Sequence, residues 1–173
     1  MNINKLLENT RSIVAIIDST KARFFTLDLE QLPDEEFGPN LIERKALSNP
    51  AKEIAGQELW ANIKTGRNRG AANQAHSYDD HRQNHIIEFE RRFAQNISDQ
   101  IISLIRVYKA KHLILVAEPQ VLGYVRESLI PMLPQNLELR ELAKDLCKLK
   151  IKEIHEYLAN KKLLPARNKL SQR

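Results

Sequence analysis

The chain has 173 residues and a mass of 20.0 kDa, with 42% hydrophobic and 28% charged residues, which is typical of one globular domain that buries its own core. Its net charge of +5 favours anionic partners, nucleic acid above all. The single cysteine, Cys147, excludes an intramolecular disulfide, and the longest early apolar run, Ile13–Ile17, is too short for a membrane span or signal peptide, so we expect a cytoplasmic protein.

Three strands are predicted in the first third of the chain. The run Ile13–Ile17 has no polar interruption, which is typical of a central strand buried on both faces. Turn-prone residues at 18–21 separate it from a strand at Ala22–Leu27, and this pattern predicts an antiparallel hairpin. Alternation over Asn40–Leu47 predicts a third, less buried strand. The sequence Ser48-Asn49-Pro50 is expected to cap a short helix.

Residues 64–85 are expected to form an exposed loop that leads into a long helix. From Gly66 to His85, Tyr78 is the only hydrophobic side chain larger than alanine, so the segment cannot bury itself. Asp79 or Asp80 is predicted to cap the helix that follows. Apolar residues then recur every three or four positions and predict that this helix covers the sheet: Ile86, Phe89, Phe93, Ile97, Ile101, Leu104, Ile105 and Tyr108.

The last third of the chain alternates strands and helices. Strands are predicted at His112–Ala117 and 136–142, and helices between Glu118 and Pro131 and at 149–161. The order βββαβαβα predicts a three-layer α/β fold of the ribonuclease-H-like type, with a mixed sheet and parallel, right-handed βαβ units. We expect one α/β domain at 1–163 and a basic, flexible tail at 164–173.

Several motifs in this order resemble the bacterial host-attachment protein family, which in turn resembles the middle domain of the eukaryotic class 1 peptide-chain release factor. The matching pieces are VAIIDSTKARFFTLD, Gly66-Arg67, HSYDDHRQNHIIEFERRFAQNISDQI, LILVAEPQVLGYVRESL and ELAKDLCKL. In release factors the loop before the first major helix carries a Gly-Gly-Gln tripeptide that helps to position water on the peptidyl-tRNA ester. Here the corresponding loop is Gly70-Ala71-Ala72-Asn73-Gln74-Ala75, which keeps Gln74 but lacks the glycine pair.

The resemblance therefore implies a single release-factor-like α/β domain at 1–163 associated with the ribosome or RNA, and not a factor that reads stop codons, because separate domains for codon reading and for partner-factor binding are lacking. The host-attachment description implies a phenotype and not a chemistry. Basic and polar residues of the loop are the expected contacts, since neutralised phosphates supply most nonspecific RNA affinity. They are Lys64, Arg67, Arg69, Asn73, Gln74, His76 and Arg82.

Other functions remain open from the residues. One is an enzyme, either for ester hydrolysis of peptidyl-tRNA assisted by Gln74, or a Mg²⁺-dependent ribonuclease that uses Asp18 and Glu118 with Glu88 or Glu90. Another is a protein-interaction module linked to host attachment, which forms a homo-oligomer through its helices. No strong catalytic signature favours an enzyme over a binding protein.

Metal and cofactor chemistry is not expected. His81 and His85 lie one helical turn apart, with His76 nearby, but the glutamate that accompanies such a pair in metalloproteases is replaced by Arg82. We therefore expect no metal site and no cofactor. Lys144 and Lys148 are candidates to lower the pKa of Cys147, yet a structural thiol is the favoured interpretation.

Overall fold

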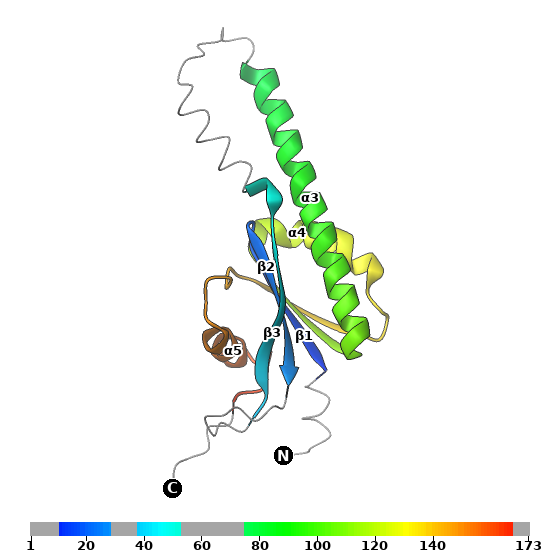
Figure 1. The fold of residues 1–173 in the computed structure, drawn as a ribbon, viewed down its shortest axis with the longest axis vertical. Coiled ribbons are helices and arrows are strands. Elements are labelled where there is room, and N and C mark those ends of the chain that lie inside the picture. The colour runs from blue at the N-terminus through cyan, green and yellow to red at the C-terminus, as the bar shows by residue number, and fades with distance from the viewer. Residues whose placement is uncertain (1–10, 29–37, 53–74, 168–173) are drawn as a thin grey trace.

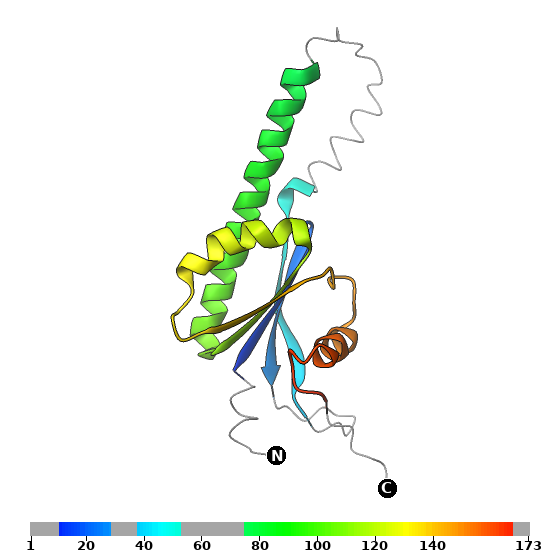
Figure 2. The same cartoon turned by 180° about the vertical axis from the view of Figure 1, so that it is seen from behind.

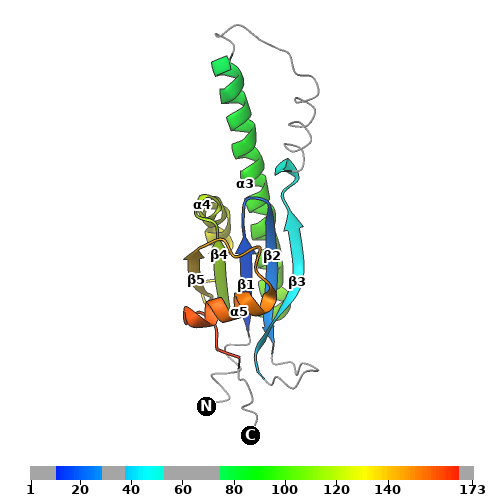
Figure 3. The same cartoon turned by 90° about the vertical axis from the view of Figure 1, so that its left-hand side faces the viewer.

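The computed structural model describes residues 11–28, 38–52 and 75–167, with the backbone alone for 75–82. It is an α/β fold in which helices lie on both faces of one mixed sheet (Figures 1 and 3). The strands are β1 (Ser12–Ile17), β2 (Lys21–Asp28), β3 (Asn40–Ser48), β4 (His112–Ala117) and β5 (Glu138–Ala143). The helices are α3 (Ala75–Tyr108), α4 (Pro119–Leu129), the short 3₁₀ helix η1 (Ile130–Met132) and α5 (Ile151–Asn160).

The central strand of the sheet is β1. The strand order is β3-β2-β1-β4-β5, with β1 antiparallel to β2 and parallel to β4. The remaining pairs are β2 with β3, which is antiparallel, and β4 with β5, which is parallel. Every residue of β1 is buried, because neighbouring strands flank it and helices cover both of its faces.

Two hydrophobic clusters separate the layers. On one face, alternate residues of β1, β2 and β4 pack under α3 and α4, with Ile97, Ile101 and Val125 among the helix residues. On the other face, the intervening strand residues pack under α5 through Ile154 and Leu158. Figure 2 shows α3 and α4 together on one side of the sheet and α5 on the other. The period of two along each strand therefore divides its side chains between the two cores.

The predicted strands are confirmed, each with ends within two residues of the expected ones. The helix predicted between Glu118 and Pro131 and the helix predicted at 149–161 are present as α4 and α5. Asn49 begins a helix as expected, since its Oδ1 accepts a hydrogen bond from Ala51 N at 3.2 Å, and the described part of that helix covers residues 50–52. The local pattern of apolar, turn-forming and capping residues was therefore sufficient to predict these strands and helices.

Two predictions about the start of α3 are wrong. Residues 75–85 are helical, so the expected loop at 64–85 does not extend past Gln74. Asp79 and Asp80 consequently lie inside α3 and do not cap it. Most residues of this segment are polar, but a helix anchored in a core extends easily, since each added residue contributes one hydrogen bond without a new nucleation step.

Only the second half of α3 covers the sheet. Among residues 83–108, whose side chains are described, Phe93 is the first buried one, after the half-buried Phe89, and burial continues through Ile97, Ile101 and Ile105. Ile86, predicted to face the core, is 46% exposed. We call residues 75–92 the α3 arm, which is about 27 Å long at 1.5 Å per residue and extends beyond the sheet (Figure 1).

Packing continues past residue 163, where the tail was expected to begin. Leu164 is buried, Pro165 O is 2.9 Å from His155 Nε2, and Arg167 Nε donates to Asn40 Oδ1 at 3.0 Å. The described chain thus stays against the α5 side of the sheet as far as Arg167. Within the described ranges, no helix combines the length and the apolarity needed to cross a bilayer.

Candidate functional site

The carboxyl ends of β1, β4 and β5 meet at one edge of the sheet, because these strands are parallel. The α3 arm rises beyond this same edge, which Figures 1 and 3 show from two directions. In open α/β sheets, ligands bind preferentially outside the carboxyl ends of the strands. This edge and the α3 arm are therefore the candidate functional region of the described chain.

Asp18 organises the turn between β1 and β2. Its Oδ1 accepts hydrogen bonds from Thr20 N at 2.7 Å, Thr20 Oγ1 at 2.7 Å and Lys21 N at 2.8 Å. The side chain is buried, with 6% of its residue surface exposed. Burial raises the pKa of Asp18, but these hydrogen bonds outweigh burial, so the net pKa lies below the ordinary value of 3.8. Asp18 therefore acts as a turn residue, one of its two expected roles.

Two further side chains attach this turn to neighbouring strands. Glu118, which follows β4, accepts a hydrogen bond from Ser19 N on Oε2 at 3.2 Å and makes no side-chain cap to α4. Asn49, which follows β3, donates from Nδ2 to Ser19 O at 3.0 Å and from its backbone N to Thr20 O at 2.7 Å. The hairpin turn thus holds the ends of β1, β3 and β4 together.

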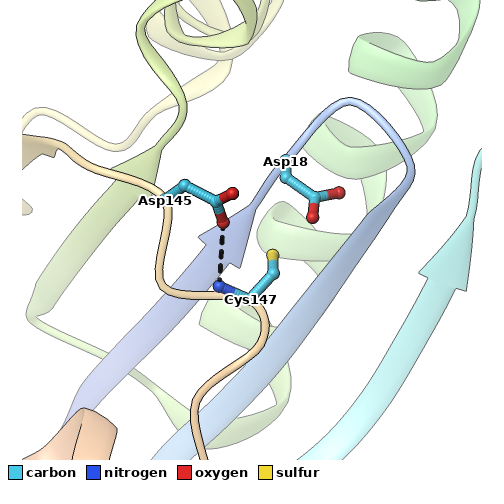
Figure 4. Close-up of side chains that lie close together, drawn as sticks. All are labelled: Asp18, Asp145 and Cys147. Atoms are coloured by element: carbon cyan, nitrogen blue, oxygen red, sulfur yellow. Dashed lines mark hydrogen bonds between the residues drawn. The ribbon is translucent and has the colours of Figure 1, made fainter.

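The segment after β5 completes the edge with Asp145 and Cys147 (Figure 4). Asp145 Oδ1 accepts a hydrogen bond from Cys147 N at 3.1 Å. Ligand-type atoms of Asp18, Asp145 and Cys147 lie within 4.8 Å of one another. The Asp18 carboxylate is already satisfied by the turn, so the packing of the hairpin accounts for the cluster without a ligand.

Cys147 is a buried, unreactive thiol. Burial, followed by the negative charges of Asp18 and Asp145, raises its pKa to about 12. The idea that Lys144 and Lys148 lower this pKa is therefore wrong, because desolvation of the thiol and the nearby carboxylates of Asp18 and Asp145 dominate. The thiol lies 3.8 Å from Lys21 O and 1% of the residue surface is exposed. The favoured structural interpretation of this cysteine is consistent with that environment.

We expect Cys147 to react with a thiol-specific reagent about a thousandfold more slowly in the folded protein than in the denatured chain at mildly alkaline pH, since roughly three units of pKa separate the two thiols. The measurement is the labelling rate followed by intact mass. A variant that combines Cys147→Ser with Glu156→Cys, an exposed position on α5, provides the rapidly labelled control. Equal rates for Cys147 in the folded and denatured states would contradict its burial.

Arg23 fastens the segment after β5 to the sheet. Its guanidinium contacts Glu43 on β3 in a two-pronged ion pair, with Nε to Oε1 at 2.9 Å and Nη2 to Oε2 at 3.0 Å. Nη1 donates to Cys147 O at 3.0 Å and to Leu149 O at 2.8 Å, and the group lies over the Phe25 ring. Arg23 is not among the predicted site residues, although a lone arginine among the apolar residues of β2 was a usable signal in the sequence.

The predicted RNA-contact residues fall into two groups. Lys64, Arg67, Arg69, Asn73 and Gln74 lie outside the described residues. His76 and Arg82 lie on the α3 arm, of which the backbone is described there. Farther along the arm, His85, Arg91 and Arg92 are exposed, and Arg92 forms an ion pair with Glu88.

The residues of the ribonuclease hypothesis are spread over two places. Asp18 and Glu118 lie at the same edge, but both accept hydrogen bonds from the hairpin turn. Glu88 and Glu90 lie on the α3 arm. In the described part of the chain, the acidic group around Asp18 includes Asp145 and Cys147 and does not include Glu118 or a histidine.

Comparison with known proteins adds one finding. A family model described as "Protein required for attachment to host cells" matches residues 13–158, a range that includes β1 without its first residue, β2 to β5, α3, α4 and most of α5. No curated protein matches the sequence.

Proposed function

The chain belongs to the family of proteins described as required for attachment to host cells, and we propose that it is a single-domain, release-factor-like protein that contacts RNA or the ribosome through residues 64–85. The proposal concerns a molecular contact, whereas the family description concerns an outcome for the whole cell. Binding, and not reading of stop codons, is the proposed activity.

The sheet supports the release-factor-like part of the proposal. The antiparallel strands β3, β2 and β1 continue into the parallel strands β4 and β5, with α3 and α4 on one face and α5 on the other. This arrangement is the one expected for a ribonuclease-H-like sheet of the release-factor middle-domain type. Fold alone does not assign function, so a site is needed.

The α3 arm is the observation that carries the proposal. Residues 83–88 of the arm are exposed, so this part of the helix adds little to the stability of the domain, and such an extension is typical of a part that reaches a partner. The residues that precede it in the sequence, 64–74, contain Lys64, Arg67 and Arg69 and no acidic residue. A basic segment next to a projecting arm suits contact with a phosphate backbone.

Gln74 directly precedes the first residue of α3. Hydrolysis of the peptidyl-tRNA ester by Gln74 is the alternative activity at the same place. Asn73 occupies the position before the glutamine, where the resemblance requires glycine, so the backbone freedom of the release-factor tripeptide is reduced. For this reason we place binding ahead of hydrolysis.

The test is co-sedimentation of the purified protein with ribosomes and with total RNA. The double variant Arg67→Ala/Arg69→Ala is expected to bind about tenfold more weakly near physiological salt and to show a shallower salt dependence, since two phosphate contacts are lost. The matched control, Lys148→Ala/Lys152→Ala, removes two exposed charges in and before α5 and should bind like the unmodified chain.

Equal binding by the two double variants would contradict the assigned contact segment. In the same preparation, a peptidyl-tRNA release assay with Gln74→Ala distinguishes hydrolysis from binding alone. Loss of release with retained co-sedimentation would favour the hydrolytic alternative.

A further inference from the structure

A second surface lies on the half of α3 that covers the sheet. There α3 and η1 border a hollow of about 420 Å³ lined by Asp99, Ile102, Ser103, Arg106, Val107 and Met132. Its apolar rim is unusually open, with Val107 69% and Met132 39% exposed. Clustered exposed apolar side chains of this kind, bordered by charges, are typical of protein interfaces.

The two charged residues at this hollow are arranged so that the face can pair with the same face of a second copy of the chain. Asp99 and Arg106 are seven residues apart and therefore lie on one face of α3, with Ser103 between them. In the described part of the chain neither residue forms an ion pair, and Asp99 accepts a hydrogen bond from Gln95 at 3.0 Å. The face therefore presents one charge of each sign, at equal distances from the midpoint between residues 102 and 103, and neither charge has an ion-pair partner among the described residues.

We propose that this face is the interface of a homodimer, in which the α3 helices of two copies pack antiparallel about a two-fold axis near Ile102 and Ser103. In an antiparallel pair centred there, Asp99 of each copy lies opposite the partner's Arg106, so both charge pairs form at once. A parallel pair would place like charges together. The small Ser103 side chain lets the two helices approach closely at the axis.

The apolar residues fit the same symmetry. Gln95 Nε2 lies 3.8 Å from Met132 Sδ, which places Met132 near the Asp99 end of the face, whereas Val107 lies at the Arg106 end. The two-fold axis exchanges these ends. Val107 of each copy consequently packs against the partner's Met132, and both exposed apolar side chains are buried by one operation.

This inference does not depend on the proposed RNA contact, because the interface begins beyond the α3 arm. Antiparallel pairing directs the two arms in opposite directions. With the axis near residue 102 and a rise of 1.5 Å per residue, the two arm ends lie about 80 Å apart. The dimer therefore presents two separate contact sites.

The experiment is sedimentation velocity of the full chain at micromolar concentrations. The unmodified protein is expected to be dimeric. Asp99→Arg and Arg106→Asp, each alone, place like charges across the axis twice and should weaken dimerisation at least about tenfold. The combined variant Asp99→Arg/Arg106→Asp restores opposite charges and should dimerise again.

The two single variants also test the charge contacts across the interface when they are mixed. One then carries only positive charges at both positions and the other only negative charges, so an antiparallel pair is attractive and a heterodimer should form. Lys152→Glu on the exposed side of α5 is the charge-reversal control and should leave the dimer unchanged. Circular dichroism verifies that each variant is folded.

A monomeric unmodified protein would overturn the proposal. So would a dimer that neither single variant weakens, or single variants that fail to pair when mixed although both are folded. Recovery of dimer in both the combined variant and the mixture supports the antiparallel two-fold interface.

Discussion

Asp18→Ala is expected to lower the free energy of unfolding by about 3 kcal/mol. The buried carboxylate accepts hydrogen bonds from Thr20 N, Thr20 Oγ1 and Lys21 N, and its removal takes away all three of these hydrogen bonds at once. The turn that loses them also holds Glu118 and Asn49, so the effect extends to the ends of β3 and β4. Urea unfolding followed by circular dichroism measures the change.

Asp18→Asn separates charge from shape. It keeps a side-chain oxygen for Thr20 N and Lys21 N, so the loss near neutral pH should be smaller than for alanine. The pKa of Asp18 is lowered in the folded protein, so its ionisation contributes stability that is present above the ordinary value of 3.8 and is lost as the pH falls below it. The unmodified protein should therefore lose more stability between about pH 5 and about pH 3 than Asp18→Asn.

An Asp18→Ala variant as stable as the unmodified protein would contradict the role of this turn. Asp145→Ala is the matched control, since Asp145 is exposed and accepts one hydrogen bond from Cys147 N. The Asp18→Asn variant also tests the ribonuclease hypothesis. A Mg²⁺-dependent cleavage that this variant abolishes while the protein stays folded would assign Asp18 to catalysis.

Arg23→Leu is expected to destabilise the protein by about 3 kcal/mol. The guanidinium satisfies Glu43, Cys147 O and Leu149 O together, and leucine leaves a partly buried carboxylate and two carbonyl groups without these donors. The segment from Cys147 to α5 should loosen first, because Arg23 is its link to β2. Thermal unfolding gives the overall change, and amide hydrogen exchange locates it in residues 145–160.

Arg23→Lys keeps the charge but not the planar fork, so it should retain part of the stability. Arg126→Leu removes an exposed arginine that pairs with Glu141 and should change stability far less. Hydrogen exchange that rises equally across the whole chain in Arg23→Leu would contradict a specific link to the segment after β5.

The sequence predicted an element correctly where its hydrophobic pattern is compatible with only one kind of secondary structure and burial. The unbroken run at Ile13–Ile17 required a strand covered on both sides, and β1 is such a strand. The three- and four-residue spacing from Phe93 to Ile105 required a helix with one buried face. These patterns predicted the element order and the mixed sheet, because alternation and helical period follow from local backbone geometry.

The candidate site was harder to predict. Asp18 and Glu118 were recognised as residues at strand ends, but their shared attachment to Ser19 and Thr20 joins positions about 100 residues apart in the sequence. Arg23 and Asp145 were not recognised, because their partners lie on other elements. The RNA-contact segment at 64–74 is still a prediction, since those residues lie outside the described structure.

By itself, then, the sequence determined the strands, most of the helices and their order, since burial patterns along a chain are set by local periodicity. Only the tertiary structure decided that α3 begins at Ala75 and extends as an arm, that burial and carboxylates raise the pKa of Cys147, and that Asp99, Arg106 and Met132 share one open face. Each of these features depends on contacts between residues that are far apart in the sequence. Local periodicity along the chain does not show which of these residues come into contact.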